Sequence, residues 1–323
     1  MPLRIMMMGT GTFALPTFRA LIKSEHEVIG LVTQPDRTGR GHHRHVNQLK
    51  EIALENDVDV FQPESANAPE SLQQLKDFNA DIFVVAAYGQ ILSKELLAIP
   101  RLGAVNLHGS LLPKYRGAAP VQFAVLNGEK ETGVTLFQIE PKLDAGPILG
   151  VVKTDIGHKE TSGQLHDRLA ELSAPLTLDV LQKLEAGTIE EITQEASAVT
   201  KAPKIRKEHG LIDWSKKSEQ IGWHVFGMQP WPMPFTFLHH PERKSTRILI
   251  LDVVELTSED ATTVESLPVG GLRQVESRLL VRTGDGGLEI MKLQPAGKKP
   301  MAASQFLCGT NVEGAAFGPE QQD

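Results

Sequence analysis

Three side chains suited to moving protons and stabilising charge stand close together in the first half of the chain: Asn106, His108 and Asp144. Glycine and proline recur around them in the stretch 109–120, so that stretch is not ordinary helix or central strand. An imidazole accepts a proton, an amide donates to an oxyanion, and a carboxylate holds the imidazole. The pattern favours transfer of an acyl-type group to an amine, although each residue alone is more often a satisfied polar group.

The elements that would position these side chains alternate between apolar runs and helical patterns. This alternation predicts an α/β domain with a Rossmann-like, mostly parallel sheet. The expected strands are 4–8, 28–32, 82–86, 104–107 and 133–139. The expected helices are one after the first glycine-rich turn and those at 47–55, 69–78 and 121–127. Asn106 and His108 would then lie at the carboxyl end of a strand, where open α/β sheets bind ligands.

A long helix is expected farther along the chain. Leucine and valine recur at helical spacing over 161–185, with Thr161 as a cap and Gly187 as a stop, and the apolar stripe predicts a core-facing helix. Pro175 lies inside this stretch and is expected to break or kink the helix.

The second half of the chain has a different pattern. Its short alternating runs at 247–254, 277–283 and 287–292 are separated by turn signals and predict a small β domain, a sandwich or a barrel. Of the two we expect a small, OB-like β-barrel. We therefore expect a catalytic domain at 1–195, a basic linker at 196–208, a β-barrel domain at 209–314 and a frayed tail at 315–323.

Composition bounds the possible partners and setting. The formal net charge of −7 argues against a protein that coats nucleic acid through its overall field, so a nucleic acid would have to meet local basic patches. The only cysteine, Cys308, permits no internal disulfide, which fits a reducing, cytoplasmic setting. The apolar start at 4–9 predicts a strand rather than a signal peptide. We expect a cytoplasmic monomer without membrane contact.

One glycine-rich turn offers a rival interpretation. Gly9, Gly11 and Ala14 follow a predicted strand and open a helix, as in the G-x-G-x-x-A turn that binds dinucleotides. Asp36 stands near the end of the second strand, where a ribose-binding acid is sought, and the combination predicts an NAD-type oxidoreductase. The glycine pattern has little specificity by itself, and Asp36 suits a turn equally well, so the oxidoreductase remains an alternative.

The run 106–113, together with 116–120 and 143–146, resembles the active-site region of the folate-dependent formyltransferases. The resemblance implies that the amide, imidazole and carboxylate named above carry catalysis. It further implies that 10-formyltetrahydrofolate donates a formyl group as a co-substrate. Such a site uses no metal.

Other residues take places in the folate site by the same resemblance. Four are expected to line the reduced folate: Ser110, Leu111, Leu112 and Pro113. A second set is expected to read the pterin edge, largely through backbone groups: Tyr88, Gly89, Gln90, Ile91 and Leu92. Gly9, Thr10 and Phe13 match a loop that lies beside the reaction centre in the family, which gives the first turn a meaning without a dinucleotide.

Segments outside the catalytic strings indicate the acceptor of the formyl group. They resemble the family members that formylate initiator methionyl-tRNA for translation initiation, and they are 33–41, 202–205, 212–215, 230–233 and 293–301. In those members a basic loop enters the acceptor-stem region of the tRNA, which implies contacts from Arg37, Arg40 and Arg44. Further candidates for phosphate contact are Lys204, Arg206, Lys207, Lys298 and Lys299.

Three alternatives concern the basic loop and the acceptor. The histidines of 42–45 raise the question of a metal site, but the neighbouring arginines would repel a cation and no carboxylate or thiolate cluster completes a ligand set. We therefore expect no metal. An amino sugar nucleotide or another small amine is an alternative acceptor. An RNA-binding module with an inactive core is the remaining alternative.

Overall fold

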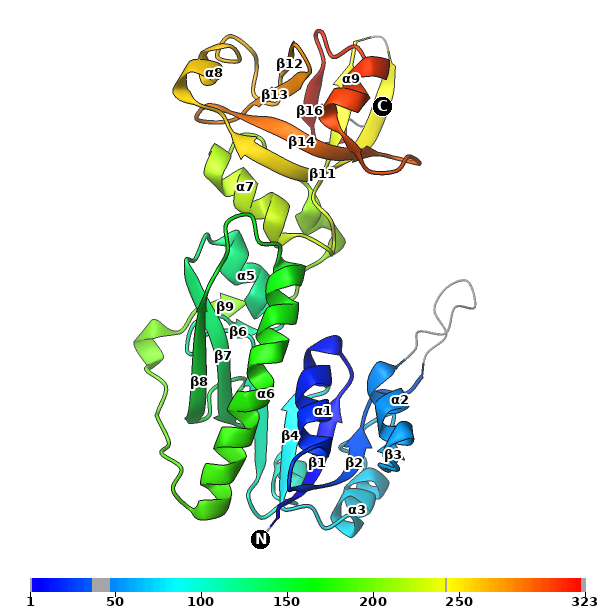
Figure 1. The fold of residues 1–323 in the computed structure, drawn as a ribbon, viewed down its shortest axis with the longest axis vertical. Helices are drawn as coiled ribbons and strands as arrows, with labels where there is room; N and C mark the ends of the chain where they lie inside the picture. The colour runs from blue at the N-terminus through cyan, green and yellow to red at the C-terminus, as the bar shows by residue number, and fades with distance from the viewer. Residues whose placement is uncertain (1, 37–46, 242, 321–323) are drawn as a thin grey trace. The chain divides into compact units, whose positions relative to one another are not determined.

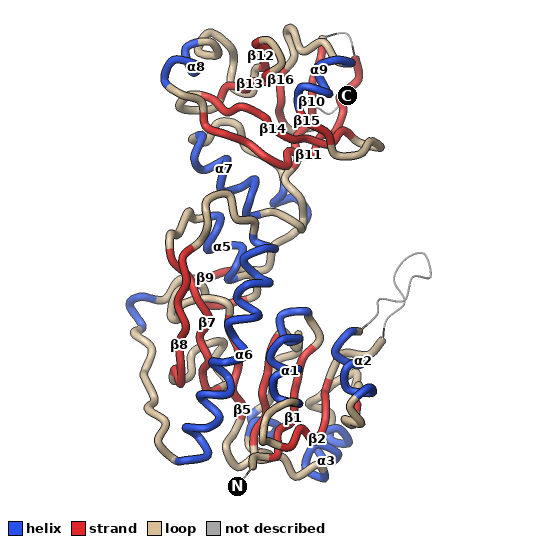
Figure 2. Tube along the Cα trace, viewed as in Figure 1, coloured by secondary structure: helices blue, strands red, loops and turns tan. Residues whose placement is uncertain are grey.

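The computed structural model describes residues 2–36, 47–241 and 243–320. Its residues form two compact units, which are described separately below (Figures 1 and 2). The first unit comprises Met1–Pro120, Glu131–Asp155 and Leu165–Pro203, and the second comprises Val121–Lys130, Ile156–Gln164 and Lys204–Asp323. Two short segments that the sequence analysis placed in the catalytic domain, 121–130 and 156–164, thus group with the second unit.

The first unit is built on a seven-stranded sheet of order β3-β2-β1-β4-β5-β7-β8. Its strands are β1 (Arg4–Gly9), β2 (Glu27–Val32), β3 (Val60–Phe61), β4 (Ile82–Ala86), β5 (Ala104–His108), β7 (Glu131–Gln138) and β8 (Ile148–Asp155). The first five are parallel, whereas β7 and β8 are antiparallel additions at one edge. The expected mostly parallel sheet is confirmed, and the buried apolar runs of β1 and β4 are typical of strands covered on both faces.

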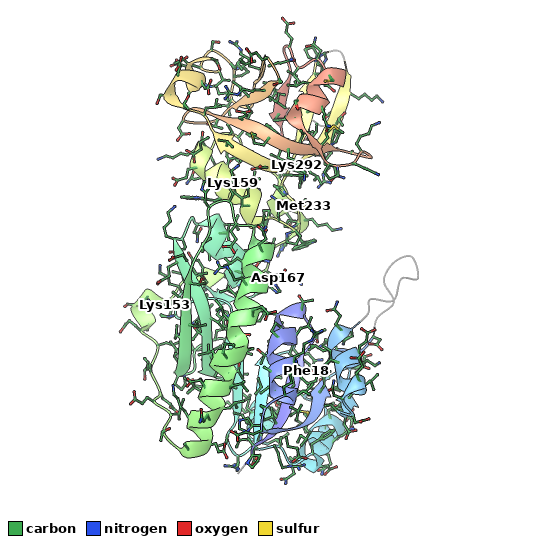
Figure 3. The ribbon with its side chains drawn as sticks, viewed as in Figure 1. Phe18, Lys153, Lys159, Asp167, Met233 and Lys292 are labelled. Atoms are coloured by element: carbon green, nitrogen blue, oxygen red, sulfur yellow. The ribbon has the colours of Figure 1, made fainter. Side chains whose placement is uncertain are left out.

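Helices cover this sheet, and all but the short α4 lie where the sequence pattern predicts them. They are α1 (Leu15–Ile22), α2 (Gln48–Glu55), α3 (Pro69–Asp77), α4 (Lys94–Leu97) and α6 (Ser162–Ala186), with a 3-10 turn η1 (Thr12–Ala14) before α1. The Asn47 side chain caps α2 by accepting from the Lys50 N–H, which explains its sharp start. Phe18 of α1, labelled in Figure 3, is fully buried.

Helix α6 runs through Pro175 without a break, so the expected break is wrong. Buried hydroxyls support the helix around the proline: Ser173 donates to the Ala170 carbonyl and Thr177 donates to the Ser173 carbonyl. The Ser173 hydroxyl also lies 2.8 Å from the hydroxyl of Thr17 on α1. Tertiary packing of α6 in the first unit thus outweighs the local cost of the proline.

The second unit contains an antiparallel sheet of order β12-β13-β14-β11-β10-β16. The unit's elements are α5 (Pro120–Leu126), α7 (Ser218–Gly227), β10 (Phe235–His240), β11 (Arg243–Glu255), α8 (Ser258–Thr262), β12 (Leu272–Val275), β13 (Arg278–Arg282), β14 (Gly287–Pro295), β15 (Met301–Ala302), α9 (Ala303–Gly309) and β16 (Ala316–Gly318). Pro120, the first residue of α5, falls at the end of the first unit's range.

The two outer strands of this sheet meet and close it into a small barrel, as expected. Gly271 forms an antiparallel bridge to Ala316, and the Phe317 N–H donates to the Gly270 carbonyl at 2.8 Å. Gly270 has a φ of +79°, and a Cβ there would lie 2.2 Å from the Phe317 oxygen, so the closure requires glycine at this position.

The expected frayed tail at 315–323 is wrong for its first residues. Strand β16 pairs with β10, and Phe317 is 3% exposed. Its ring stacks on Trp214 with ring centroids 5.3 Å apart. A single aromatic residue in a short strand gives no apolar periodicity, which is why the pattern missed it.

Candidate active site

Strand β5 carries two of the three candidate catalytic side chains to the carboxyl edge of the sheet. Asn106 lies opposite Val85 of β4 and Phe137 of β7, and His108 lies opposite Thr135 at the strand's last residue. This is the position expected from the sequence, since a parallel sheet gathers its functional groups at the carboxyl ends of its strands.

His108 is buried and held in one orientation. Its Nε2 lies 2.9 Å from the backbone carbonyl of Tyr115, which only accepts hydrogen bonds. The neutral ring therefore carries its hydrogen on Nε2, and Nδ1 presents a lone pair on the side of Asp144, whose Oδ2 is 4.0 Å away. Burial lowers the pKa of His108 below 6.5; the Asp144 charge and the Tyr115 carbonyl oppose this, while Arg116 adds to it.

Asp144 sits in the turn between β7 and β8 and is nearly buried, with its side chain 11% exposed. Its Oδ2 accepts the backbone N–H of Gly117 at 2.8 Å, and its own φ is +48°, a conformation that L-residues seldom adopt. The carboxylate thus joins the loop after β5 to the loop after β7. An ionised Asp144 stabilises a protonated His108.

Asn106 is half-buried, and within the described residues its amide makes no side-chain hydrogen bond. An amide in this state is free to donate to a ligand oxygen beside His108. The residue types at this edge of the sheet, an amide two residues before a buried imidazole and a carboxylate 4.0 Å from that imidazole, are those that can donate to an oxyanion, accept a proton and balance its charge.

The segment expected to line the folate is a tightly bonded turn. Ser110 is fully buried, and its hydroxyl donates to the Lys114 carbonyl at 2.7 Å. The Thr135 hydroxyl donates to the Ser110 carbonyl and accepts the Leu112 N–H. Leu111 and Pro113 are part-buried, and Leu112 packs with Phe137. The geometry gives Ser110 a role in shaping the turn.

The expected pterin-reading segment follows β4 and is fixed by its own side chains. The Gln90 amide accepts the Ala66 N–H and donates to the Glu64 carbonyl, and Leu92 is buried. Tyr88 is 2% exposed, and burial raises the pKa of its phenol to about 12. In contrast, Gly89 has a φ of +87° and Ile91 is 83% exposed. The exposed side of the segment therefore consists of backbone groups and the Ile91 side chain.

The first glycine-rich turn is tied to the same segment. The Thr10 hydroxyl donates to the Tyr88 carbonyl at 3.3 Å, and the Gly11 N–H donates to the Ala87 carbonyl at 3.3 Å. A Cβ on Gly9 would lie 3.0 Å from the Ala86 oxygen, and Phe13 is buried against the ring of His166. The turn thus supports the loop after β4.

These contacts weaken the dinucleotide interpretation. The Gly11 N–H, which a pyrophosphate-binding turn leaves for its ligand, is engaged by protein. Asp36 forms an ion pair with Lys50 and accepts from the Gln62 amide, so its carboxylate is committed to neighbouring side chains. The dinucleotide interpretation therefore lacks both groups that would bind the ligand, the Gly11 N–H for the pyrophosphate and the Asp36 carboxylate for the ribose.

The basic candidates fall into two sets. Arg37, Arg40 and Arg44 lie outside the described residues. The others belong to the second unit and are all exposed: Lys204, Arg206, Lys207, Lys298 and Lys299. Lys298 and Lys299 follow a turn after β14 in which Gly297 has a φ of +73°. Their exposure leaves these cations accessible to a polyanion.

Residues that sequence reasoning missed hold the site together. Gln194 is buried and bonds to Arg116 and to the carbonyls of Asp144 and Gly146. The Thr200 hydroxyl accepts the Tyr115 N–H at 2.8 Å. Their partners are 48 to 85 residues away in sequence, and no local motif marks them.

The linker expected at 196–208 accordingly starts later than predicted. Strand β9 (Lys201–Ala202) pairs in parallel with β6 (Arg116–Gly117), and Ile192 bridges to Ile148. The segment Leu165–Pro203 thus belongs to the first unit, and Lys204 begins the last segment of the second unit. These backbone pairings were invisible in a polar, basic stretch of sequence.

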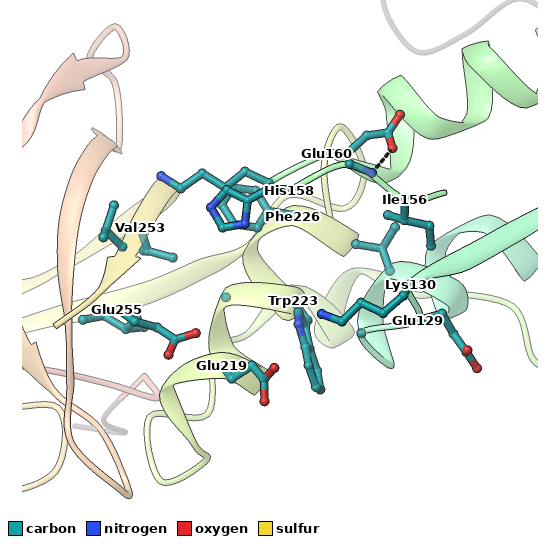
Figure 4. A pocket seen from close by; sticks show the side chains of 17 residues that line it. Glu129, Lys130, Ile156, His158, Glu160, Glu219, Trp223, Phe226, Val253 and Glu255 are labelled. Atoms are coloured by element: carbon teal, nitrogen blue, oxygen red, sulfur yellow. Dashed lines mark hydrogen bonds between the residues drawn. The ribbon is translucent and has the colours of Figure 1, made fainter. Parts of the chain in front are cut away.

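A cavity of about 520 Å³ lies within the second unit and shares no lining residue with the site around His108 (Figure 4). Trp223 and Phe226 of α7 line it together with charged side chains that include Lys130, Glu219 and Glu255. This mixed lining selects no ligand class.

Among the residues that the structure describes, no group of three or more His, Cys, Asp or Glu side chains is placed to hold a metal ion. In the same part of the chain, no helix has the length and apolarity needed to span a bilayer. The histidines of 42–45 lie outside the described residues.

Comparison with known families decides among the remaining interpretations. The formyl transferase model matches residues 3–181, and the model of the formyl transferase C-terminal domain matches residues 204–311. The chain belongs to the formyl transferase family. Both units of this formyltransferase therefore contain segments matched by family models, and the α/β sheet and the small barrel are the folds of those matched regions.

Curated relatives are similar to this formyltransferase over nearly its whole length. The methionyl-tRNA formyltransferase of Methylococcus capsulatus is 41% identical over 98% of this chain and 100% of its own length. The methionyl-tRNA formyltransferase of Nitratidesulfovibrio vulgaris is 42% identical over 95% of this chain and 93% of its own length.

Solved structures share the fold at lower identity. WlaRD, a sugar 3N-formyl transferase solved in the presence of dTDP and 5-N-formyl-THF, has a TM-score of 0.66 at 18% identity and covers 93% of this chain and 100% of its own. HypX from Aquifex aeolicus in complex with tetrahydrofolic acid has a TM-score of 0.61 at 14% identity, over 95% of this chain and 47% of its own. These likenesses show the fold of the formyltransferase.

Proposed function

We propose that this formyltransferase transfers the formyl group of 10-formyltetrahydrofolate to the α-amine of methionine esterified to initiator tRNA, for translation initiation. The observation that carries the proposal is the placement of His108 Nδ1 beside Asp144, next to the unengaged Asn106 amide. The relatives named methionyl-tRNA formyltransferase support the choice of acceptor, since they match both the catalytic region and the second domain. We expect the protein to act as a cytoplasmic monomer.

The chemistry follows from the orientation of the three side chains. The neutral amine attacks the formyl carbon, a C–N bond forms, and the carbonyl electrons move to oxygen. Asn106 donates to that oxyanion, and Nδ1 of His108 accepts the proton that the amine loses. Asp144 stabilises the resulting imidazolium. Collapse of the intermediate breaks the bond to folate N10, which receives a proton and leaves as tetrahydrofolate.

His108 and Asp144 are the two candidates to take the amine's proton first. His108 and Asp144 lie 4.0 Å apart, so the carboxylate stabilises a proton on the ring. The low pKa of His108, caused by burial, keeps the ring neutral at neutral pH and ready to accept. This favours His108 as the first acceptor.

Recognition of tRNA is assigned to the basic residues. Arg37, Arg40 and Arg44 are proposed to follow the backbone of the acceptor stem. The exposed lysines and arginine of the second unit are proposed to supply further phosphate contacts: Lys204, Arg206, Lys207, Lys298 and Lys299. A protein with net charge −7 needs such local patches to bind a polyanion.

The decisive experiment offers the purified protein 10-formyltetrahydrofolate with methionyl initiator tRNA and, separately, with an amino sugar nucleotide. We expect formylmethionine on the tRNA and no formylated sugar. Formylation of the sugar nucleotide alone would transfer the assignment to the second candidate, a sugar N-formyltransferase, as WlaRD is named. Absence of both products would refute both.

A further inference from the structure

Two loops meet in the site, and each contributes to the His108–Asp144 pair. The loop after β5 contains Arg116 and Gly117, and the turn between β7 and β8 contains Asp144 and Gly146. Their direct link near the chemistry is the Gly117 N–H, which donates to the Asp144 carboxylate at 2.8 Å. A single hydrogen bond of this kind stabilises the contact between two loops only weakly.

Gln194 bridges the same two loops with both ends of its amide. Its Oε1 accepts from Arg116 Nε at 3.1 Å and from Arg116 Nη2 at 2.7 Å. Its Nε2 donates to the Asp144 carbonyl at 3.0 Å and to the Gly146 carbonyl at 2.8 Å. The side chain is buried, with 8% of the residue exposed, and the amide's acceptor and both its donor hydrogens are engaged.

The Asp144 backbone needs such support. A φ of +48° at a residue with a Cβ is unfavourable and persists where surrounding contacts fix it. Gln194 bonds the carbonyl of that same residue, and Gly146 lies two residues later. The backbone of Gln194 is anchored in turn, because Ile192 exchanges both hydrogen bonds with Ile148 of β8.

We propose that Gln194 is a positioning residue that holds Asp144 in register with His108 by tying the Asp144 turn to Arg116. Its four hydrogen bonds go to Arg116 and to two backbone carbonyls, so its effect on the chemistry runs through Asp144. The inference rests on the proposed function for its kinetic consequence, whereas its structural consequence, the spacing of Asp144 and His108, is measurable without turnover.

The test replaces Gln194 with methionine, which has a similar length and makes none of the four hydrogen bonds. We expect the kcat for formylation to fall by about 10- to 100-fold, because displacement of a catalytic group by about 1 Å costs up to that much. We also expect the pKa of His108, followed by NMR in protein labelled with ¹⁵N-histidine, to fall further, because the ring loses the nearby carboxylate. His108→Asn assigns the resonance.

A matched control is Gln229→Met. The Gln229 amide also donates to two backbone carbonyls, those of Val225 and Leu251, but it belongs to the second unit. It should lower thermal stability without moving kcat or the pKa of His108. Gln194→Glu is the second variant at the site: it retains an acceptor for Arg116 and loses both donors, so kcat should still fall.

The outcomes distinguish the positioning role of Gln194 from the proposed function. A fall in both kcat and the His108 pKa in Gln194→Met, with neither in Gln229→Met, supports positioning. A parental pKa in Gln194→Met, or a parental kcat in both Gln194 variants, overturns it. If Gln194→Met does not fold, a parental kcat in Gln194→Glu still overturns it. A parent protein that formylates no tRNA refutes the proposed function, while the NMR arm still reports whether Gln194 fixes the pair.

Discussion

The backbone carbonyl of Tyr115 fixes the tautomer of His108. With Nε2 bonded to that carbonyl at 2.9 Å, the basic nitrogen of the neutral ring is Nδ1, which faces Asp144. Tyr115 itself has a φ of +64° and is held by the Thr200 hydroxyl. The orientation of His108, the proposed proton acceptor, thus depends on Thr200, which stands 92 positions later in the chain.

That dependence predicts the effect of Thr200→Val. The variant removes the acceptor of the Tyr115 N–H, and a hydrogen bond worth about 1 kcal/mol corresponds to about a fivefold loss of kcat if it is expressed in the orientation of His108. Thr200→Ser keeps the hydroxyl and should retain parental kcat. Steady-state formylation kinetics of the two variants test this. Equal kcat values in both would show that the Thr200 hydroxyl does not influence the site.

Asn106→Ala should lower kcat on the order of 100-fold or more, because it removes the donor to the developing oxyanion. The residue is half-buried and its amide has no side-chain hydrogen bond within the described residues, so the fold should tolerate the change. Asn56→Ala, which removes a hydrogen bond at the end of α2, is the matched control. Near-parental turnover of Asn106→Ala would show that the oxyanion donor lies elsewhere.

Stability should depend on pH through His108. Burial lowers the pKa of His108 in the folded protein below 6.5, so the unfolded chain binds this proton more readily. The stability that neutral His108 contributes is present above pH 6.5 and is lost as the pH falls from there toward the lower folded pKa. Urea unfolding at a series of pH values should show a steeper loss for the parent than for His108→Asn; identical slopes would contradict it.

Phe317→Ala should destabilise the second unit by about 3–5 kcal/mol, the usual cost of truncating a buried phenylalanine. The ring is 3% exposed and stacks on Trp214. Denaturant unfolding followed by tryptophan fluorescence measures the change. The exposed Glu320 supplies the control, Glu320→Ala, whose stability should equal that of the parent.

Arg40→Ala should raise the KM for tRNA and leave the KM for the folate unchanged. If Arg40 contacts one phosphate, the slope of log affinity against log salt should decrease in magnitude by about 1. Binding to methionyl initiator tRNA at several salt concentrations measures the slope. An unchanged slope would exclude Arg40 from phosphate contact.

Much of the first unit was predictable from local sequence. Apolar runs typical of buried strands predicted β1, β4 and β5 to within one residue of their observed ends. The glycines of the following loop marked the sheet edge where Asn106 and His108 lie. The helix α6 was predicted as well, but not its passage through Pro175, because the supporting hydroxyl bonds and packing are tertiary.

The supports of the site were not predictable in this way. Gln194 and Thr200 stand in a polar stretch that is typical of a linker, and their partners are brought to them only by the closing of the fold. Phe317 was missed for a similar reason: three residues of β16 carry too little pattern to predict a strand, yet they complete a barrel.

The pairing of Gly270 and Gly271 with Ala316 and Phe317 has one more consequence. An edge strand with unpaired N–H and C=O groups is a template on which another chain adds a strand and begins to aggregate. In the second unit residues 270–272, which lead into β12, pair their backbone with residues 315–317, at the start of β16. A variant truncated before β16 would therefore expose two unpaired strand edges at once, that of β10 and that of the segment leading into β12. This variant should aggregate as well as unfold.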